Sequence, residues 1–259
     1  MKGLPLKLPI FLRNRYTFAK NKWSLDKSIR MLTPRHSPAA ILVQNGTKWW
    51  VTGGQNATEI LQSTEMLSLG PRGLSLGFVK GIDLPVGIVG HCIARINNTH
   101  VFMAGGSIPN AYIFNEYTFE YIILPKLHSQ RSGAACMAIQ KEYKTTLMVV
   151  GGTCLLSHSC ATETEQYDLD DHIMDNHWKR GPRNNLGGWS HGDYISYPDE
   201  RGMVLIGSHP HPKVGDLSNN IIQFNVTTES FVKLPGVLKH SRQGEVAIYV
   251  PKRTFSCDE

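Results

Sequence analysis

The chain has 259 residues, of which 41% are hydrophobic and 19% charged, and this balance favours one folded domain with an ample core. No apolar run approaches the roughly 18 residues that a membrane-spanning helix needs, so we expect no membrane span. The formal net charge of +6 is uneven: residues 1–36 hold nine Lys or Arg and one acid, and the remainder holds 18 basic and 20 acidic residues. A nearly neutral body argues against a nucleic-acid partner.

The two ends of the chain contain predicted strands without a complete repeat. Within the basic segment 1–34, residues 16–18 and Trp23 predict two neighbouring short strands, and residues 10–12 predict another. Near the other end, residues 246–250 read as a first strand with no second strand after it, followed by a tail at 251–259. We therefore expect the two ends to share one unit of structure.

Between these ends, an apolar run that stops at a pair of glycines recurs four times. The glycines are Gly53, Gly54, Gly105, Gly106, Gly151, Gly152 and, in a degenerate fourth copy, Gly207. Positions 54, 106, 152 and 207 are 52, 46 and 55 residues apart. A period near 50 with a diglycine after a strand is typical of repeat proteins built from small sheets.

Each unit continues with a third and a fourth apolar run. The fourth run carries one large aromatic residue, which is Phe78, Tyr121, Trp178 or Phe231, and a proline follows within seven residues. Four short strands with two apolar faces are not stable alone, so we expect the sheets to pack face to face around an axis. Glycine pairs suit strands that crowd together, and the aromatic residue can fill the gap between neighbouring sheets.

These features resemble the kelch family of β-propellers over about residues 10–250. The best single match is residues 162–182, with Glu165, Tyr167, Asp168 and Trp178 on the family's positions. The other units replace this tryptophan, and the fourth unit lacks one glycine. The resemblance implies an all-β kelch-type β-propeller over residues 35–250, with four complete four-stranded blades and a composite blade from the termini. The alternative is that N-terminal blades are absent from this chain, because kelch rings usually have six or more.

Basic side chains or histidines precede each predicted first strand. They are Arg35, His36, His91, Arg131, His191 and Arg242. The simpler interpretation is hydrogen bonding to the backbone of the connections between blades. The alternative is a ring of donors at one mouth of the central channel.

The five cysteines bear on the cellular compartment. Cys154 and Cys160 flank five residues in one loop, where we expect a disulfide that would require an oxidising compartment. Cys92 and Cys136 lie in predicted first strands, where we expect buried free thiols. Cys257 would remain to tie the tail or to pair with another chain.

Four Asn-x-Thr motifs predict N-glycosylation in turns. Their asparagines are Asn45, Asn56, Asn97 and Asn225. Together with the predicted disulfide, they favour a secreted protein, similar to the secreted invertebrate kelch proteins. A cytoplasmic protein is the alternative.

The sequence contains no recognisable catalytic or metal-binding motif. It has no nucleophile elbow, no HExxH and no phosphate-binding loop, and Cys154, His158 and Cys160 match no structural zinc spacing. We therefore expect no catalytic, cofactor-binding or metal-binding residues.

The longest predicted loops join second and third strands, at residues 55–63, 153–164 and 209–219, and carry little charge. Such loops suit hydrogen-bonded recognition of a protein or glycan partner. The candidate binding residues are Leu155, His158, His209 and His211. We therefore predict a non-enzymatic interaction module. The alternatives are an intracellular kelch adaptor without its usual partner domain and a sugar-processing propeller enzyme.

Overall fold

The structure is a computed structural model that describes part of the chain. That part comprises residues 14–17, 22–25, 29–69, 75–141, 144–154, 159–169, 177–197, 202–208 and 219–240.

The described chain forms four antiparallel sheets of four strands each, as the repeat predicts. The first sheet contains β3 (Ala39–Val43), β4 (Lys48–Thr52), β5 (Thr64–Leu69) and β6 (Ser75–Lys80). The second contains β7 (His91–Arg95), β8 (His100–Gly105), β9 (Ala111–Asn115) and β10 (Tyr121–Leu124). The third contains β11 (Ala135–Lys141), β12 (Lys144–Val150), β13 (Thr164–Leu169) and β14 (Lys179–Arg180). The fourth contains β15 (Asp193–Ser196), β16 (Met203–Ile206), β17 (Asn220–Asn225) and β18 (Ser230–Val237).

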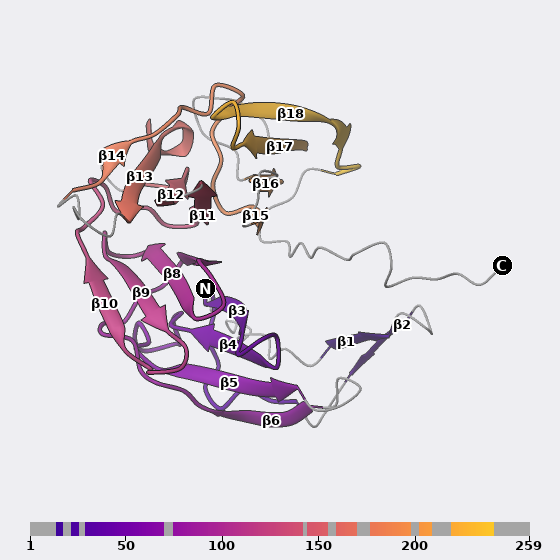
Figure 1. The fold of residues 1–259 in the computed structure, drawn as a ribbon. Helices are drawn as coiled ribbons and strands as arrows, with labels where there is room; N and C mark the ends of the chain where they lie inside the picture. Colours follow the sequence, from indigo (N-terminus) through magenta and orange to yellow (C-terminus); the bar gives the residue numbers. More distant parts are fainter. Residues whose placement is uncertain are drawn as a thin grey trace, which may run out of the picture.

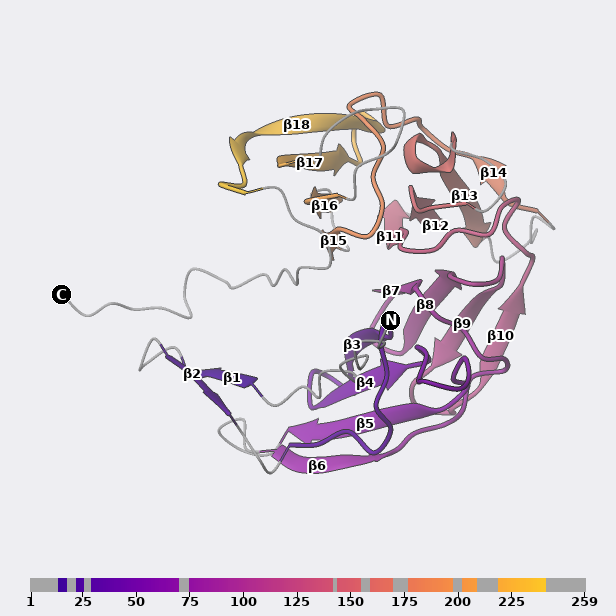
Figure 2. The same cartoon turned by 180° about the vertical axis from the view of Figure 1, so that it is seen from behind.

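The four sheets follow one another around an open arc, with their first strands, β3, β7, β11 and β15, toward its centre (Figures 1 and 2). A separate pair, β1 (Asn14–Thr17) and β2 (Lys22–Leu25), lies on the open side of the arc (Figure 2). This pair corresponds to the two strands predicted around Tyr16 and Trp23. The strands predicted at residues 10–12 and 246–250 lie outside the described residues.

Apolar side chains fill the spaces between neighbouring sheets. Trp50 of the first sheet stacks on Phe114 of the second, with ring centroids 4.3 Å apart. The ring centroids of Trp178 and Phe102 are 6.0 Å apart, and the indole N–H of Trp178 donates to the carbonyl oxygen of Pro125 at 2.8 Å. These contacts place large aromatic side chains between neighbouring sheets, where they cover apolar faces that water would otherwise contact.

Glycine pairs end the second strands where adjacent sheets come closest. Gly53 and Gly54 have φ values of 56° and 91°, which side-chain-bearing residues rarely adopt. A Cβ on Gly53 would also lie 2.4 Å from the carbonyl oxygen of Ile88 in the connection to the next sheet. The diglycine therefore allows neighbouring sheets to approach.

Two disulfides are present, and one of them corrects a prediction. Cys154 and Cys160 are bonded across their loop, with Cα atoms 6.0 Å apart, as their spacing suggests. The expectation of free thiols at Cys92 and Cys136 is wrong, because these residues form a disulfide with Cα atoms 5.4 Å apart. The bond joins β7 to β11, and these strands become neighbours only when the second and third sheets pack together.

Candidate binding end of the arc

Strand direction separates two ends of the arc. Connections from second to third strands, and from each sheet to the next, lie at one end, which we call the loop end. The loop end comprises residues 53–63, 81–90, 106–110, 125–134, 151–154, 159–163 and 181–192. The turns at the opposite end, which we call the turn end, comprise residues 44–47, 96–99, 116–120 and 226–229.

Backbone hydrogen bonds tie each sheet to the next at the loop end. The N–H of Gly54 donates to the carbonyl oxygen of Ile88 at 2.8 Å, and the N–H of Gly106 donates to the carbonyl oxygen of Arg131 at 2.7 Å. The N–H of Gly152 donates in the same way to Trp189 at 2.9 Å. The second glycine of each pair thus fixes the connection that leads to the next sheet of the arc.

A second row of hydrogen bonds runs between residues one or two positions ahead of the first strands. Ser37, Gly90, Gly133 and His191 all have positive φ, between 48° and 70°. The N–H of Gly90 donates to the carbonyl of Ser37 at 3.0 Å, and that of Gly133 donates to Gly90 at 2.8 Å. The N–H of His191 continues the row to Gly133 at 2.9 Å. The loop end is therefore held by one continuous row across four sheets.

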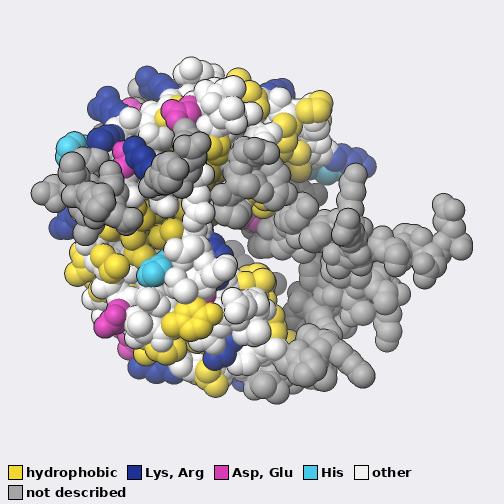
Figure 3. Space-filling model, in the orientation of Figure 1, with side chains coloured by type: hydrophobic (Ala, Val, Ile, Leu, Met, Phe, Trp, Pro, Cys, Tyr) yellow, Lys and Arg dark blue, Asp and Glu magenta, His cyan; other side chains and the backbone are white. Residues whose placement is uncertain are grey.

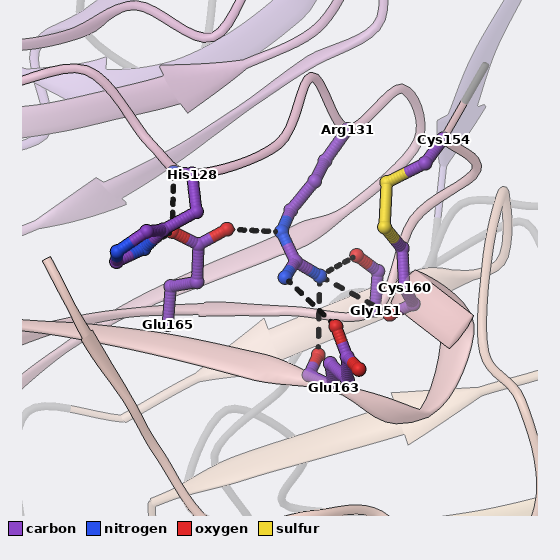
Figure 4. The surroundings of a disulfide bond; sticks show 7 residues. All are labelled: His128, Arg131, Gly151, Cys154, Cys160, Glu163 and Glu165. Atoms are coloured by element: carbon purple, nitrogen blue, oxygen red, sulfur yellow. Dashed lines mark hydrogen bonds and ion pairs between the residues drawn. A yellow bond between two sulfur atoms is a disulfide. The ribbon is translucent and has the colours of Figure 1, made fainter. Parts of the chain in front are cut away.

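A buried ion pair organises the loop end of the third sheet (Figure 4). The Nε of Arg131 lies 2.7 Å from Oε1 of Glu165 on β13, and both side chains are almost fully buried. The same guanidinium donates to the carbonyl oxygens of Gly151, Cys160 and Glu163. The other oxygen of Glu165 accepts from the backbone N–H of His128 at 2.7 Å. These contacts anchor both sides of the disulfide-closed loop.

The first sheet has the same arrangement. Nη2 of Arg35 lies 2.7 Å from Oε1 of Glu65, and Nη1 donates to the carbonyl oxygens of Gly53 and Ser63. Glu65 also accepts from the N–H groups of Leu32 and Thr33. At Arg35 and Arg131 the arginines ahead of the first strands therefore bond to the backbone of the connections, which is the simpler of the two interpretations drawn from the sequence.

Apolar residues take these positions in the second and fourth sheets. The strand register places Tyr112 and Ile222 where the first and third sheets have Glu65 and Glu165. Ile88 and Trp189 occupy the positions of the arginines, and all four apolar residues are buried. One structural position thus accepts either an ion pair or an apolar pair.

Two polar side chains, one buried and one partly buried, lie near the centre of the arc. Nε2 of His91 lies 2.8 Å from the hydroxyl of Thr52, and burial lowers the pKa of His91 to about 4, so its imidazole is neutral near pH 7. The hydroxyl of Tyr194 on β15 donates to the carbonyl of Ile93 at 2.8 Å and accepts from its N–H at 3.0 Å. Burial raises the pKa of Tyr194 above its usual value. The Tyr194 side chain therefore links the second and fourth sheets.

Large apolar side chains are exposed on the loop end and the segment that leads into it. Leu32, Ile60, Val86 and Leu186 are 59%, 42%, 36% and 41% exposed. Val86 and Leu186 lie in two different connections between sheets, those from the first to the second and from the third to the fourth. Around the rim of the molecule, acidic and basic side chains are mixed rather than separated by sign (Figure 3).

The binding residues predicted from the sequence, Leu155, His158, His209 and His211, all lie outside the described residues. Cys154 and η3 (Ser159–Thr162) border the segment that contains the first two. The structure therefore describes the anchors of this loop.

Neither protein-family models nor curated protein sequences match this chain, so these comparisons assign it to no family. Within the described ranges, no group of three or more His, Cys, Asp or Glu side chains is placed to hold a metal ion. No helix among these residues is long and apolar enough to cross a membrane.

Sequence reasoning missed several elements of the loop end, but one had a readable signal. Arginine stands four residues ahead of the first strand only in those two complete units whose third strand also carries the aligned glutamate. That co-occurrence indicates an arginine–glutamate ion pair in each of these two units. The bonds of Tyr194 to Ile93 had no such signal, because the two residues are 101 positions apart.

Proposed function

We propose that this protein is a non-enzymatic, kelch-type β-propeller that binds a protein partner through its loop end and acts in an extracellular setting. The observation that carries the proposal is the set of exposed apolar side chains Leu32, Ile60, Val86 and Leu186 on a hydrogen-bonded framework. Exposed apolar groups on a rigid support are typical of protein-binding surfaces, since little entropy is lost on binding. The two disulfides support the extracellular setting.

The alternative of a sugar-processing enzyme has less support. Such an enzyme needs acid–base groups that face its substrate. Near the centre of the arc, the His91 imidazole is buried against Thr52, and the Tyr194 hydroxyl is bonded to Ile93. Among the described residues, Glu65 and Glu165 are already paired with arginines.

Site-specific crosslinking tests the binding proposal. A photoreactive amino acid at Val86 or Leu186 is expected to capture the same protein from the natural source, identified by mass spectrometry. Tyr117, at the turn end and 51% exposed, is the matched control position and should give no such product. Replacing both loop-end residues by aspartate should weaken the captured complex at least about tenfold, as for loss of central apolar contacts. Equal capture from both ends, or capture that survives the aspartates, would contradict the proposal.

We also propose that residues 242–250 and the N-terminal strands complete the ring as a composite blade. The support is a repeated spacing: Arg35, Ser37 and Ala39 recur as Arg131, Gly133 and Ala135, and the tail contains Arg242, Gly244 and Val246 at the same intervals. Ser37 and Gly133, the middle residues of the first two triplets, belong to the hydrogen-bonded row that links the sheets.

Truncation tests this closure. Removing residues 242–259 should lower the midpoint of thermal unfolding by about 10 °C. The first strand of a blade supports the sheets on both sides of it, so its loss should lower the free energy of unfolding by several kcal/mol, which corresponds to a shift of this size. Removing only residues 251–259 is the matched control and should leave the midpoint unchanged. Equal midpoints for the two truncations, both at the value of the full chain, would show that the tail does not complete the ring.

A further inference from the structure

The four Asn-x-Thr motifs are unevenly placed between the two ends of the arc. Asn45 and Asn97 lie in the turns that join first to second strands, and Asn225 ends the third strand of the fourth sheet. All three are at the turn end. Asn56 is in the connection from second to third strand and is therefore at the loop end. The linear sequence does not reveal this segregation, which follows from strand direction.

Hydrogen bonds between neighbouring sheets confirm that their turns share one end. The N–H of Gln44, beside Asn45, donates to Glu116 in the β9–β10 turn at 2.8 Å. The side-chain amide of Gln140, at the end of β11, donates to the carbonyl of Ile96, beside Asn97, at 2.8 Å. Asn45 and Asn97 thus project from the same end of adjacent sheets.

These two asparagines meet the steric requirement for a glycan. Both are exposed, whereas Asn56 and Asn225 are only half-exposed. A Cβ added at Gly46, next to Asn45, would have nothing within 4 Å, so this turn is open to solvent. In the second turn, Oδ1 of Asn97 accepts from the N–H of Thr99 at 2.9 Å, and Oδ1 of Asn56 accepts from the N–H of Thr58 in the same way, so exposure rather than turn geometry separates the two sites.

We propose that the turn end carries N-linked glycans at Asn45 and Asn97, and that the loop end is free of them. The disulfides provide independent support, because the oxidising secretory compartment that forms such bonds also attaches N-glycans. A bulky hydrated glycan on these turns excludes macromolecular partners from that end. The inference does not rest on the proposed partner binding.

Peptide mapping of the protein from its natural source tests this assignment. Enzymatic release of N-glycans in heavy-oxygen water converts each glycosylated asparagine to a labelled aspartate. Labelled aspartate is expected at positions 45 and 97 and not at position 56. Unlabelled asparagine at both 45 and 97 would overturn the proposal, and so would label at 56, because the glycans would then not be confined to the turn end.

Aspartate variants of the full chain, secreted from cultured eukaryotic cells, provide a second measurement. N45D and N97D keep the turn oxygen but remove the acceptor nitrogen, so each should lower the intact mass by one glycan and the double variant by two. N98D is the matched control, because Asn98 is exposed in the same turn but begins no Asn-x-Ser/Thr motif. A glycan mass unchanged in the double variant would overturn the assignment. Crosslinking at Val86 and Leu186 decides the binding proposal separately.

Discussion

Replacing Cys92 and Cys136 together by alanine should lower the free energy of unfolding by about 4 kcal/mol. The two cysteines are 44 positions apart, and the disulfide restricts a long loop of the unfolded chain. In the folded state the bond also links β7 to β11 between neighbouring sheets. Urea titration followed by fluorescence would measure the change, and the midpoint of thermal unfolding should fall by about 10 °C.

The Cys154–Cys160 disulfide is the matched comparison. Its cysteines are only six positions apart, so the same argument gives a loss of about 2 kcal/mol for the double alanine variant. The longer loop should therefore give the larger effect. If the two double variants lose equal stability, the inter-sheet disulfide is not the main covalent constraint on the arc.

The repeat could be predicted because its signals are local. Apolar runs, glycine pairs and turn residues act within about ten neighbouring positions, and they predicted an all-β chain with four four-stranded units. Trp178 could also be nominated, because a large aromatic residue recurs at the same place in each fourth strand. The structure places its indole between the second and third sheets.

The remaining features depend on how the sheets pack. Cys92 meets Cys136 across two sheets, and Tyr194 meets Ile93 across the centre of the arc. Such pairs have no fixed spacing in the sequence, because sheet packing brings them together. The exposed apolar residues Val86 and Leu186 were missed for a related reason. A single valine or leucine near a proline or glycine looks like any connection until its exposure is known.

The buried Arg131–Glu165 pair leads to the second large prediction. Changing Glu165 to alanine should cost about 3–5 kcal/mol, because the buried Arg131 loses its close carboxylate and keeps only that of the partly exposed Glu163, 4.0 Å away. Lys80 and Asp83 provide a matched exposed pair, 3.1 Å apart, with side chains that are 68% and 43% exposed. Changing Asp83 to alanine should cost no more than about 1 kcal/mol. Urea titration measures both, and equal losses would contradict the structural role of the buried pair.

The apolar pair in the second sheet sharpens this experiment. In the second sheet, Ile88 and Tyr112 fill the positions of the arginine and the glutamate. The double variant R131I/E165Y places the same apolar pair in the third sheet. Removing both charges avoids an unpaired buried ion, although the carbonyl oxygens of Gly151 and Cys160 lose their donor. The double variant should therefore lose less than half as much stability as E165A alone. A double variant as unstable as the single one would mean that the arginine's backbone bonds, rather than charge pairing, hold the loop end together.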